Sequence, residues 1–563
     1  MGKLLDVSYD VFFSILELTD AESLLAVGQC NRQCREWARD TLLWKEIVRR
    51  MQEHGIQFPA DRFTSIDRMP IEQLKRCTLR ACRIRRKWSS EESYPTKSFV
   101  VDCNPSRYQH GVFYTTQRIR WIIPITDDFF AVKLGYHLSS GFLQIWQRDV
   151  DAPRIVVHLR YDWITWGHCT DLAGKAWYFI FSEHNPNQFG HTIYVMKFTG
   201  FESDPERKLE PMIVAKYPTY GSIINVFILD VTRRALCILY SGAPSGNVTL
   251  FFVPDWLEKS SVHIDTGIKD DYLTKSTFIC WMDTGKDQDT GKDQLLVQFE
   301  PTPKERAYQH VYLLHDLTRY MDPVPAFPFP LPSPPFLKPN QVFDLTIVDT
   351  PPSQVSYHKL KSIVSFDHRY FPILPRASDT RVPPICSHIS FASSFGRDLN
   401  PTYVFKHVHV GLAGARPFIR RIVTPAVCRM AFEQDYMESN TSRRFPIGHA
   451  LDLRGHELVA LGYACAAWVE ARPGLNPDVI LDFDQEEYDL KLVLFPWNAE
   501  EGEPGGMPRS SAGLNNDTVM SVCTIKCPPE VDLAKVTGLW LDAVQGRIFV
   551  GMKWGKFIVL DFS

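Results

Sequence analysis

From about residue 99 to the end of the chain, short apolar runs recur between glycine, proline, aspartate and asparagine residues. Clear examples are the runs at 142–146, 177–181, 226–229 and 248–253. Apolar runs of this length, bounded by turn-forming residues, are typical of β-strands. Because almost no helical pattern separates the runs, the chain predicts antiparallel hairpins and meanders rather than a parallel sheet.

Four of these segments share one arrangement, in which an apolar run ends at an aspartate and a short turn leads into a strand that ends at a glycine. The aspartates are Asp127, Asp230, Asp452 and Asp542. Aspartate and the turn residues start a tight reversal, and the glycine closes the next one. A long series of such hairpins must avoid open sheet edges, which radial blades achieve. We expect a degenerate β-propeller of six to eight blades; two stacked β-sandwiches or barrels are the alternative.

The residues ahead of this region follow a helical period. Ser8, Asp20 and Asn31 can each cap a short helix, because apolar residues follow at three- and four-residue spacings. Residues 44–51 continue with a fourth amphipathic set. Fewer than about 50 residues bury too little surface for secure stability. We therefore expect this unit to pack against the next domain or against a partner.

Residues 7–44 resemble an F-box, the segment by which substrate receptors attach to the Skp-type adaptor of cullin-RING ubiquitin ligases. The match without a gap places Asp10 at the Glu position, Ile15–Leu16 at Ile-Leu, Leu24–Leu25 at Leu-Leu and residues 40–44 at the closing Asp-Pro-x-Leu-Trp. The sequence departs from the family pattern at Val7–Ser8 for Leu-Pro, at Cys30–Asn31 for Val-Cys and at Cys34 for Trp.

The resemblance implies a non-catalytic substrate-recognition subunit of a Skp-cullin-F-box type E3 ubiquitin ligase. The N-terminal unit would bind the adaptor and, through it, a cullin, while the propeller would hold an unidentified target protein. A scaffold with a diverged F-box and an enzyme with an active site in the propeller channel stay open as alternatives. The implied adaptor-binding residues are Val7, Val11, Phe12, Ile15, Leu16, Leu24, Leu25, Cys30 and Cys34.

The expected class is thus an α plus all-β multidomain protein. We divide it into an F-box-like helical domain at 1–52, a helical linker at 53–94 and a β-propeller-like domain at 95–563. In the linker, an apolar stripe predicts one amphipathic helix whose other sides are filled by lysine and arginine. This basic face either docks an acidic or nucleic-acid partner or is simply solvated, and the second interpretation is favoured. The stripe consists of Leu74, Cys77, Ala81, Ile84 and Trp88.

Three stretches interrupt the strand pattern. A proline-rich insertion at 322–340 contains eight prolines and predicts an extended surface loop that spans two blades, with a docking peptide for a proline-binding module as the alternative. The hexapeptide DTGKDQ occurs twice in tandem at 283–294 and predicts a lengthened hairpin loop. Residues 500–516, rich in glycine, proline and serine, indicate a flexible segment.

A search for chemistry finds no signature of a catalytic, phosphate-binding or metal site. Cys523 and Cys527 have no second pair nearby, and His407 and His409 lack a third ligand, whereas structural zinc needs four. The arginine pairs at 420–421 and 443–444 could bind an acidic peptide, but neighbours on a strand face opposite ways. We expect no enzymatic activity, no cofactor and no metal.

Composition indicates which partners and which cellular compartment to expect. The net charge of −3 favours neither nucleic acid nor an anionic membrane as a partner. No run of 18 apolar residues exists, and Lys3, Asp6 and Asp10 lie in the first 14 residues, so we expect no membrane span and no signal peptide. The 13 cysteines are scattered and lie mostly in apolar runs, which is typical of buried free thiols in a reducing compartment. The expected location is the cytoplasm, the nucleus or both.

Overall fold

The computed structural model describes residues 19–563 with internal gaps, together with residues 11, 13, 15 and 16. For the strands between 356 and 425, the backbone alone is described. The longest segments outside the description are 54–68, 104–117, 284–293, 321–334, 345–355, 366–385, 426–458, 472–487 and 495–521.

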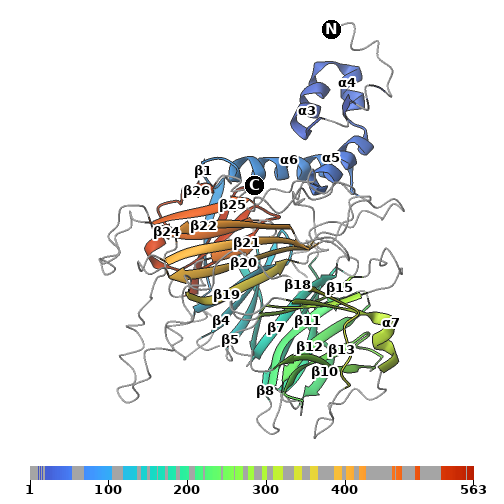
Figure 1. Ribbon diagram of the computed structural model, residues 1–563. Coiled ribbons are helices and arrows are strands. Elements are labelled where there is room, and N and C mark those ends of the chain that lie inside the picture. Colours follow the sequence, from blue (N-terminus) through green and yellow to red (C-terminus); the bar gives the residue numbers. More distant parts are fainter. Residues whose placement is uncertain are drawn as a thin grey trace, which may run out of the picture.

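The N-terminal helices form a unit at one end of the molecule, and a long helix beneath them lies along the β domain (Figure 1). Asp20 accepts a hydrogen bond from the Ser23 amide at 2.7 Å, and Asn31 accepts one from the Cys34 amide at 2.8 Å. These two predicted helix caps are confirmed, while Ser8 lies outside the described residues. The helices are α3 (Ala21–Cys30), α4 (Arg32–Trp37), α5 (Thr41–Glu53) and α6 (Ile71–Trp88).

The helical unit has its own hydrophobic core around Trp44. Trp44 is fully buried, and its indole nitrogen donates to the Ala38 carbonyl at 2.8 Å. Leu24 from α3 and Val48 from α5 pack in the same cluster. The first half of α6 completes it with Leu74, Cys77 and Ala81.

The β domain contains seven sheets among the described residues, and the pairing within each is antiparallel except where β1 joins β26. We number the sheets in chain order. Sheet 1 contains β3 (Arg118–Pro124), β4 (Phe129–Gly135), β5 (Gly141–Gln147) and β6 (Arg154–Tyr161); sheet 2 contains β7 (Trp163–Asp171), β8 (Ala176–His184), β9 (His191–Thr199) and β10 (Glu210–Thr219); sheet 3 contains β11 (Ser222–Asp230), β12 (Ala235–Ser241), β13 (Asn247–Val253) and β14 (Val262–Lys269).

Sheet 4 contains β15 (Thr277–Asp283), β16 (Gln294–Glu300), β17 (Tyr308–Leu313) and β18 (Gln341–Asp344), with the short helix α7 (Leu314–Leu317) after β17; sheet 5 contains β19 (Ser356–Ser365), β20 (Cys386–Phe395), β21 (Pro401–Val410) and β22 (Phe418–Pro425). Sheet 6 contains β23 (Val459–Gly462), β24 (Cys465–Ala471), β25 (Tyr488–Leu494), β26 (Val522–Ile525) and β1 (Glu92–Ser93); sheet 7 contains β27 (Val536–Asp542), β28 (Arg547–Met552), β29 (Lys556–Asp561) and β2 (Lys97–Asp102).

The sheets follow one another around a common centre. The first strand of each sheet from 2 to 6 contacts the first strand of the next, and β27 of sheet 7 contacts β3 of sheet 1. Sheets 1 and 2 share a core in which the rings of Trp121 and Trp166 lie 4.5 Å apart. The domain is therefore mostly β and propeller-like, as its repeated hairpins predicted.

The chain directly after α6 helps to close this ring. β2 pairs antiparallel with β29 from Lys97 opposite Asp561 to Asp102 opposite Lys556, so the C-terminal strand lies between β28 and an N-terminal strand. β1 pairs in parallel with β26 and adds a fifth strand to sheet 6. The two strands that follow α6 are thus built into two neighbouring sheets.

The recurring aspartates mark one type of turn. Asp127, Asp230 and Asp542 lie at the connections between the first and second strands of sheets 1, 3 and 7. The fourth copy differs: Asp452 lies outside the described residues, and the strand that follows it, β23, is a first strand instead of a second one.

The prediction that the proline-rich insertion spans two blades is wrong in its connectivity. The insertion lies between β17 and β18, which pair antiparallel within one sheet, so it connects two strands of one blade and does not link two blades. Its described end does reach the neighbouring sheet, since the Asp265 amide donates to the Pro335 carbonyl at 3.0 Å. Several segments lie outside the described residues: most of the insertion, the DTGKDQ repeat between its end residues, residues 500–516 and Arg443–Arg444.

Candidate protein-interaction site

The predicted adaptor-binding residues divide between the surface and the core of the helical unit. Val11 and Ile15 are 53% and 46% exposed. Cys30 is also exposed, and Leu25 is partly buried. Val7 and Phe12 lie outside the described residues. The remaining three, Leu16, Leu24 and Cys34, are buried in the core of the unit.

One exposed apolar residue of the unit was not among the predicted site residues. Leu42, in the first turn of α5, is 64% exposed, whereas Leu43 and Trp44 beside it are buried. The Asp40 carboxylate accepts a hydrogen bond from the Leu42 amide at 2.8 Å and so starts this helix. In the sequence, three apolar residues in a row gave no indication of which one faces outward. The surface of the unit thus presents Val11, Ile15 and Leu42.

α6 belongs to two hydrophobic cores at once. Its first half, through Leu74 and Ala81, packs with α5 in the helical unit. Its second half, through Ile84 and Trp88, packs in the cluster shared by sheets 6 and 7. Because one continuous helix enters both cores, the unit is held by a rigid element and not by a flexible tether.

The second half of α6 fits closely against the C-terminal sheet. Gly546, in the turn between β27 and β28, has a φ of +64°, and a Cβ placed there would lie 2.7 Å from Cγ1 of Ile84. The Trp88 ring meets that of Phe562 edge-on, with centroids 6.0 Å apart. The turn therefore needs glycine both for its backbone conformation and for the approach of α6.

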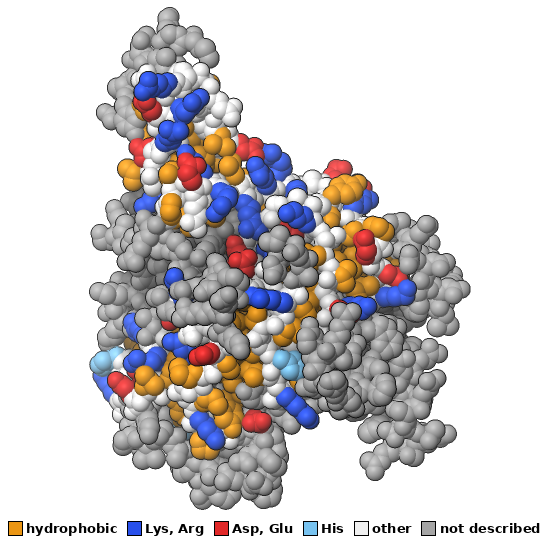
Figure 2. All heavy atoms as spheres, turned by 180° about the vertical axis from the view of Figure 1, so that it is seen from behind, with side chains coloured by type: hydrophobic (Ala, Val, Ile, Leu, Met, Phe, Trp, Pro, Cys, Tyr) orange, Lys and Arg blue, Asp and Glu red, His pale blue; other side chains and the backbone are white. Residues whose placement is uncertain are grey.

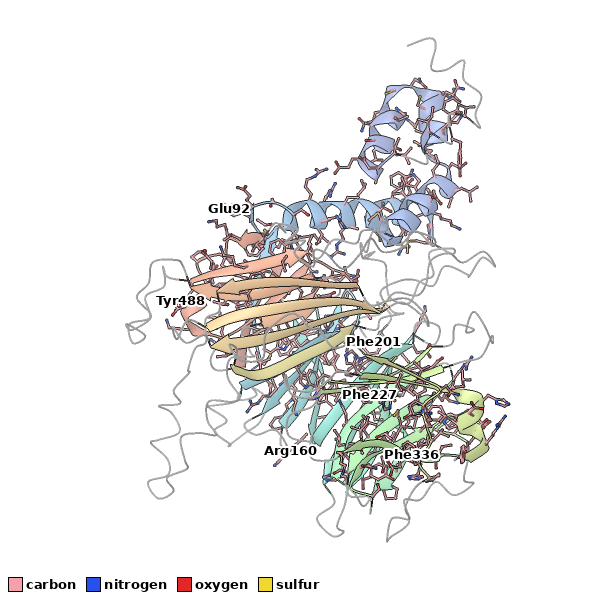
Figure 3. The ribbon with its side chains drawn as sticks, in the orientation of Figure 1. Glu92, Arg160, Phe201, Phe227, Phe336 and Tyr488 are labelled. Atoms are coloured by element: carbon pink, nitrogen blue, oxygen red, sulfur yellow. The ribbon has the colours of Figure 1, made fainter. Side chains whose placement is uncertain are left out.

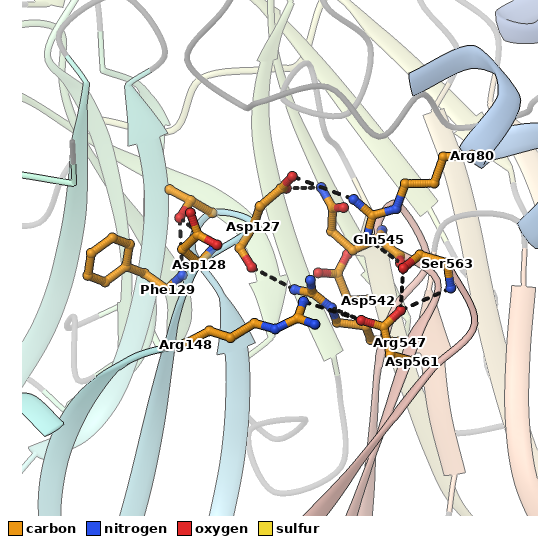
Figure 4. A network of polar contacts seen from close by, with 11 residues as sticks. Arg80, Asp127, Asp128, Phe129, Arg148, Asp542, Gln545, Arg547, Asp561 and Ser563 are labelled. Atoms are coloured by element: carbon orange, nitrogen blue, oxygen red, sulfur yellow. Dashed lines mark hydrogen bonds and ion pairs between the residues drawn. The ribbon is translucent and has the colours of Figure 1, made fainter. Parts of the chain in front are cut away.

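A polar network fixes the same junction from the side (Figure 4). Arg80 of α6 lies 3.7 Å from the Asp127 carboxylate of sheet 1 and donates to the Gln545 carbonyl of sheet 7. The Gln545 side chain donates to the Asp127 carboxylate. Arg547 donates to the Asp127 carbonyl at 2.8 Å. The helix, the first sheet and the last sheet are thereby joined where the ring closes.

Asp561 is a buried anion of this network that faces two arginines. It lies 3.2 Å from the Arg547 guanidinium and 3.3 Å from that of Arg148, and it accepts bonds from the amide and hydroxyl of Ser563. Burial raises the pKa of this carboxyl, but Arg547, Ser563 and Arg148 together outweigh burial and hold the pKa below its ordinary value. Asp561 is therefore ionised at neutral pH, and its single negative charge offsets part of the positive charge of the two arginines.

The last turn of α6 and the residues that follow it are also tied to neighbours. Arg86 forms an ion pair with Glu22 of α3, so the helical unit contacts α6 through charge as well as through its core. Figure 3 shows Glu92 just beyond the end of α6, where the chain enters sheet 6. Its carboxylate lies 2.8 Å from the Lys526 ammonium beside β26.

Within the described part of the chain, no group of three or more His, Cys, Asp or Glu is placed to hold a metal ion. The side chains of His407 and His409 lie outside the description, and Cys523 and Cys527 are free thiols. Burial raises the pKa of Cys523 to about 11 and that of Cys527 to about 12, so both are protonated at neutral pH. No described helix has the length and apolar character required to cross a membrane.

Comparisons with known proteins add little to this description. No family model and no curated protein matches the chain. Among solved structures, the Dos1 propeller is similar over 84% of this chain and 96% of its own, at 8% identity and a TM-score of 0.34. A putative 6-phosphogluconolactonase from Bacteroides uniformis is similar over 58% of this chain and 97% of its own, at 10% identity and a TM-score of 0.22. The fold described above rests on the strand pairing and not on these scores.

The arrangement offers two surfaces held at a fixed separation. The helical unit presents exposed apolar side chains at one end, and the propeller-like domain presents the turns and loops of its sheets. Such a fold supports a protein-interaction role, because its rigid strands position variable loops for binding.

Proposed function

We propose that this protein is a non-catalytic substrate-recognition subunit of a Skp-cullin-F-box type E3 ubiquitin ligase. The helical unit binds the Skp-type adaptor, and the propeller-like domain binds a target protein. The observation that carries the proposal is the double burial of α6, which holds the two modules in one orientation. A receptor that presents its target to a catalytic subunit gains from such rigidity, because fixed positioning raises the effective concentration of the reacting groups.

Within this proposal, the exposed side chains of the helical unit bear the adaptor contact. Val11 and Ile15, one helical turn apart, make direct apolar contacts, and exposed Leu42 adds to them. Leu16, Leu24 and Cys34 act indirectly, since they shape the core beneath that surface. The family's tryptophan position therefore corresponds here to a buried thiol and not to an exposed anchor.

The test is co-purification of the full-length chain with a Skp-type adaptor. A Val11→Asp/Ile15→Asp variant is expected to bind at least about tenfold more weakly, because charges enter an apolar interface. The matched control is Met212→Asp/Leu257→Asp, which changes two exposed apolar residues of the β domain. A Leu24→Asp change is unsuitable, since Leu24 is fully buried and the unit would unfold.

Equal retention of the adaptor by the two variants would contradict the proposal. Absence of adaptor binding by the unaltered chain would also contradict it, and would favour a scaffold whose helical unit binds another partner.

A further inference from the structure

α6 carries a concentration of positive charge that its packing does not require. Seven of its residues are lysine or arginine, and Glu72 is its one acidic residue. The whole chain, by contrast, has a net charge of −3. The basic residues are Lys75, Arg76, Arg80, Arg83, Arg85, Arg86 and Lys87.

Five of these seven side chains have partners within the chain or are partly buried. Arg85 is half-buried, and burial lowers the pKa of its guanidinium. The other four contacts are Arg80 with Asp127, Arg86 with Glu22, Lys75 with Glu72 and Lys87 with the Thr96 hydroxyl.

Arg76 and Arg83 are different. Both are exposed, and among the described residues neither has an ion-pair partner. They are seven positions apart, which places them on one face of the helix at a spacing of about 10 Å along its axis. Arg80 lies on the same face and contacts Asp127, so this face borders the β domain. Seen from behind, lysine and arginine side chains gather where the helical unit meets that domain (Figure 2).

We propose that this face of α6 binds an acidic segment of a partner protein through Arg76 and Arg83. In a polyproline II segment, which has three residues per turn, side chains three positions apart lie on one side and are separated by about 9 Å, close to the spacing of the two arginines. Each planar guanidinium can donate two parallel hydrogen bonds to one carboxylate. The favoured occupant is therefore a short segment in the polyproline II conformation with aspartate or glutamate at every third position.

Charge complementarity favours a peptide over a nucleic acid. Nucleic acids gain their affinity from the number of phosphates that the protein neutralises. Among the described residues, Arg76 and Arg83 are the basic side chains of this face without an ion-pair partner, and the chain outside α6 is net negative, so a long polyanion is repelled beyond the helix. A short acidic segment meets the two arginines without approaching the rest of the chain.

The experiment measures fluorescence anisotropy of a labelled Glu-Pro-Pro repeat peptide, about twelve residues long so that several acids stand about 9 Å apart on one side, titrated with the full-length chain. The Arg76→Glu/Arg83→Glu variant is expected to lower the affinity about fivefold or more. The control, Arg35→Glu/Arg39→Glu, makes the same charge change at exposed residues of the helical unit and should alter it less than twofold.

Equal losses in the two variants, or no binding by the unaltered chain, would overturn the proposal. Tighter binding of a single-stranded oligonucleotide of equal charge, with the same dependence on Arg76 and Arg83, would also overturn it. The inference does not rest on adaptor binding: the Arg76→Glu/Arg83→Glu variant should retain the adaptor, so the two proposals can fail separately.

Discussion

The helical unit and the propeller-like domain achieve their stability in different ways. The core of the unit, around Trp44, is built from residues between Leu16 and Ala81. The β domain depends on distant pairing, above all on β2 with the C-terminal strand β29. The comparison teaches that the small unit can form its helices locally but obtains its position from the large one, because α6 leads straight into the strands that close the ring.

The prediction with the largest expected effect tests whether the cores of the helical unit and of the β domain unfold independently. Trp44→Ala removes a fully buried indole and should cost about 3–5 kcal/mol, enough to unfold a unit of this size. The β domain should stay folded, with protease cleavage confined to the N-terminal residues. Trp177→Ala, at an equally buried site of sheets 1 and 2, should instead destabilise the β domain. One common loss of structure in both variants would show that the two regions unfold together.

Asp561→Asn tests the ring closure. It should lower the free energy of unfolding by about 3 kcal/mol, because Arg547 is left buried without its counter-charge. The pKa of Asp561 is lower in the folded protein than in the unfolded chain, where it is about 3.9, so the folded state binds fewer protons. Its contribution is therefore present above about pH 4 and lost as the pH falls further. Denaturant unfolding at pH 7 and at pH 3 measures both effects.

Between pH 7 and pH 3, the unfolding free energy of the Asp561→Asn variant should change less than that of the unaltered chain. Asp102→Asn, at a half-exposed ion pair with Lys556, is the control and should cost less than about 1 kcal/mol. A similar loss in both variants would mean that burial of the network has no energetic consequence.

Gly546→Ala should loosen the attachment of α6. A left-handed φ costs alanine about 1–2 kcal/mol, and the added Cβ also displaces Ile84. Gly246→Ala is a matched control, since its φ is +68° and nothing lies within 4 Å of its Cβ. The difference between the two unfolding free energies isolates the contact with α6. Equal losses of unfolding free energy in Gly546→Ala and Gly246→Ala would show that Ile84 moves aside without an energetic penalty.

The smallest effect concerns a local feature of the unit. Asp20→Ala removes the cap of α3 and should cost about 1 kcal/mol. The change should be visible in hydrogen exchange of the α3 amides while the exchange of sheets 1–4 stays the same. Faster exchange throughout the β domain would mean that the unit supports the large domain as well as depending on it.

The sequence by itself determined the elements that local chemistry specifies. Asp20 and Asn31 cap helices because their short side chains reach the nearby amides, and the 3–4 spacing from Leu74 to Trp88 specifies one long helix. Apolar runs between turn residues determined the strands, and their repetition indicated a propeller-like domain.

Only the tertiary structure decided how these elements meet. No local pattern pairs β2 with β29, because strand pairing is chosen by contacts between residues far apart in the chain. Nor could spacing show that Leu24 and Cys34 are buried while Val11, Ile15 and Leu42 face outward, since burial depends on which surface α5 and α6 cover. The division of the α6 stripe between two cores has the same cause. Its apolar residues could pack against other helices or against a sheet, and only the packing of the whole molecule places Leu74 in the helical unit and Trp88 against sheets 6 and 7.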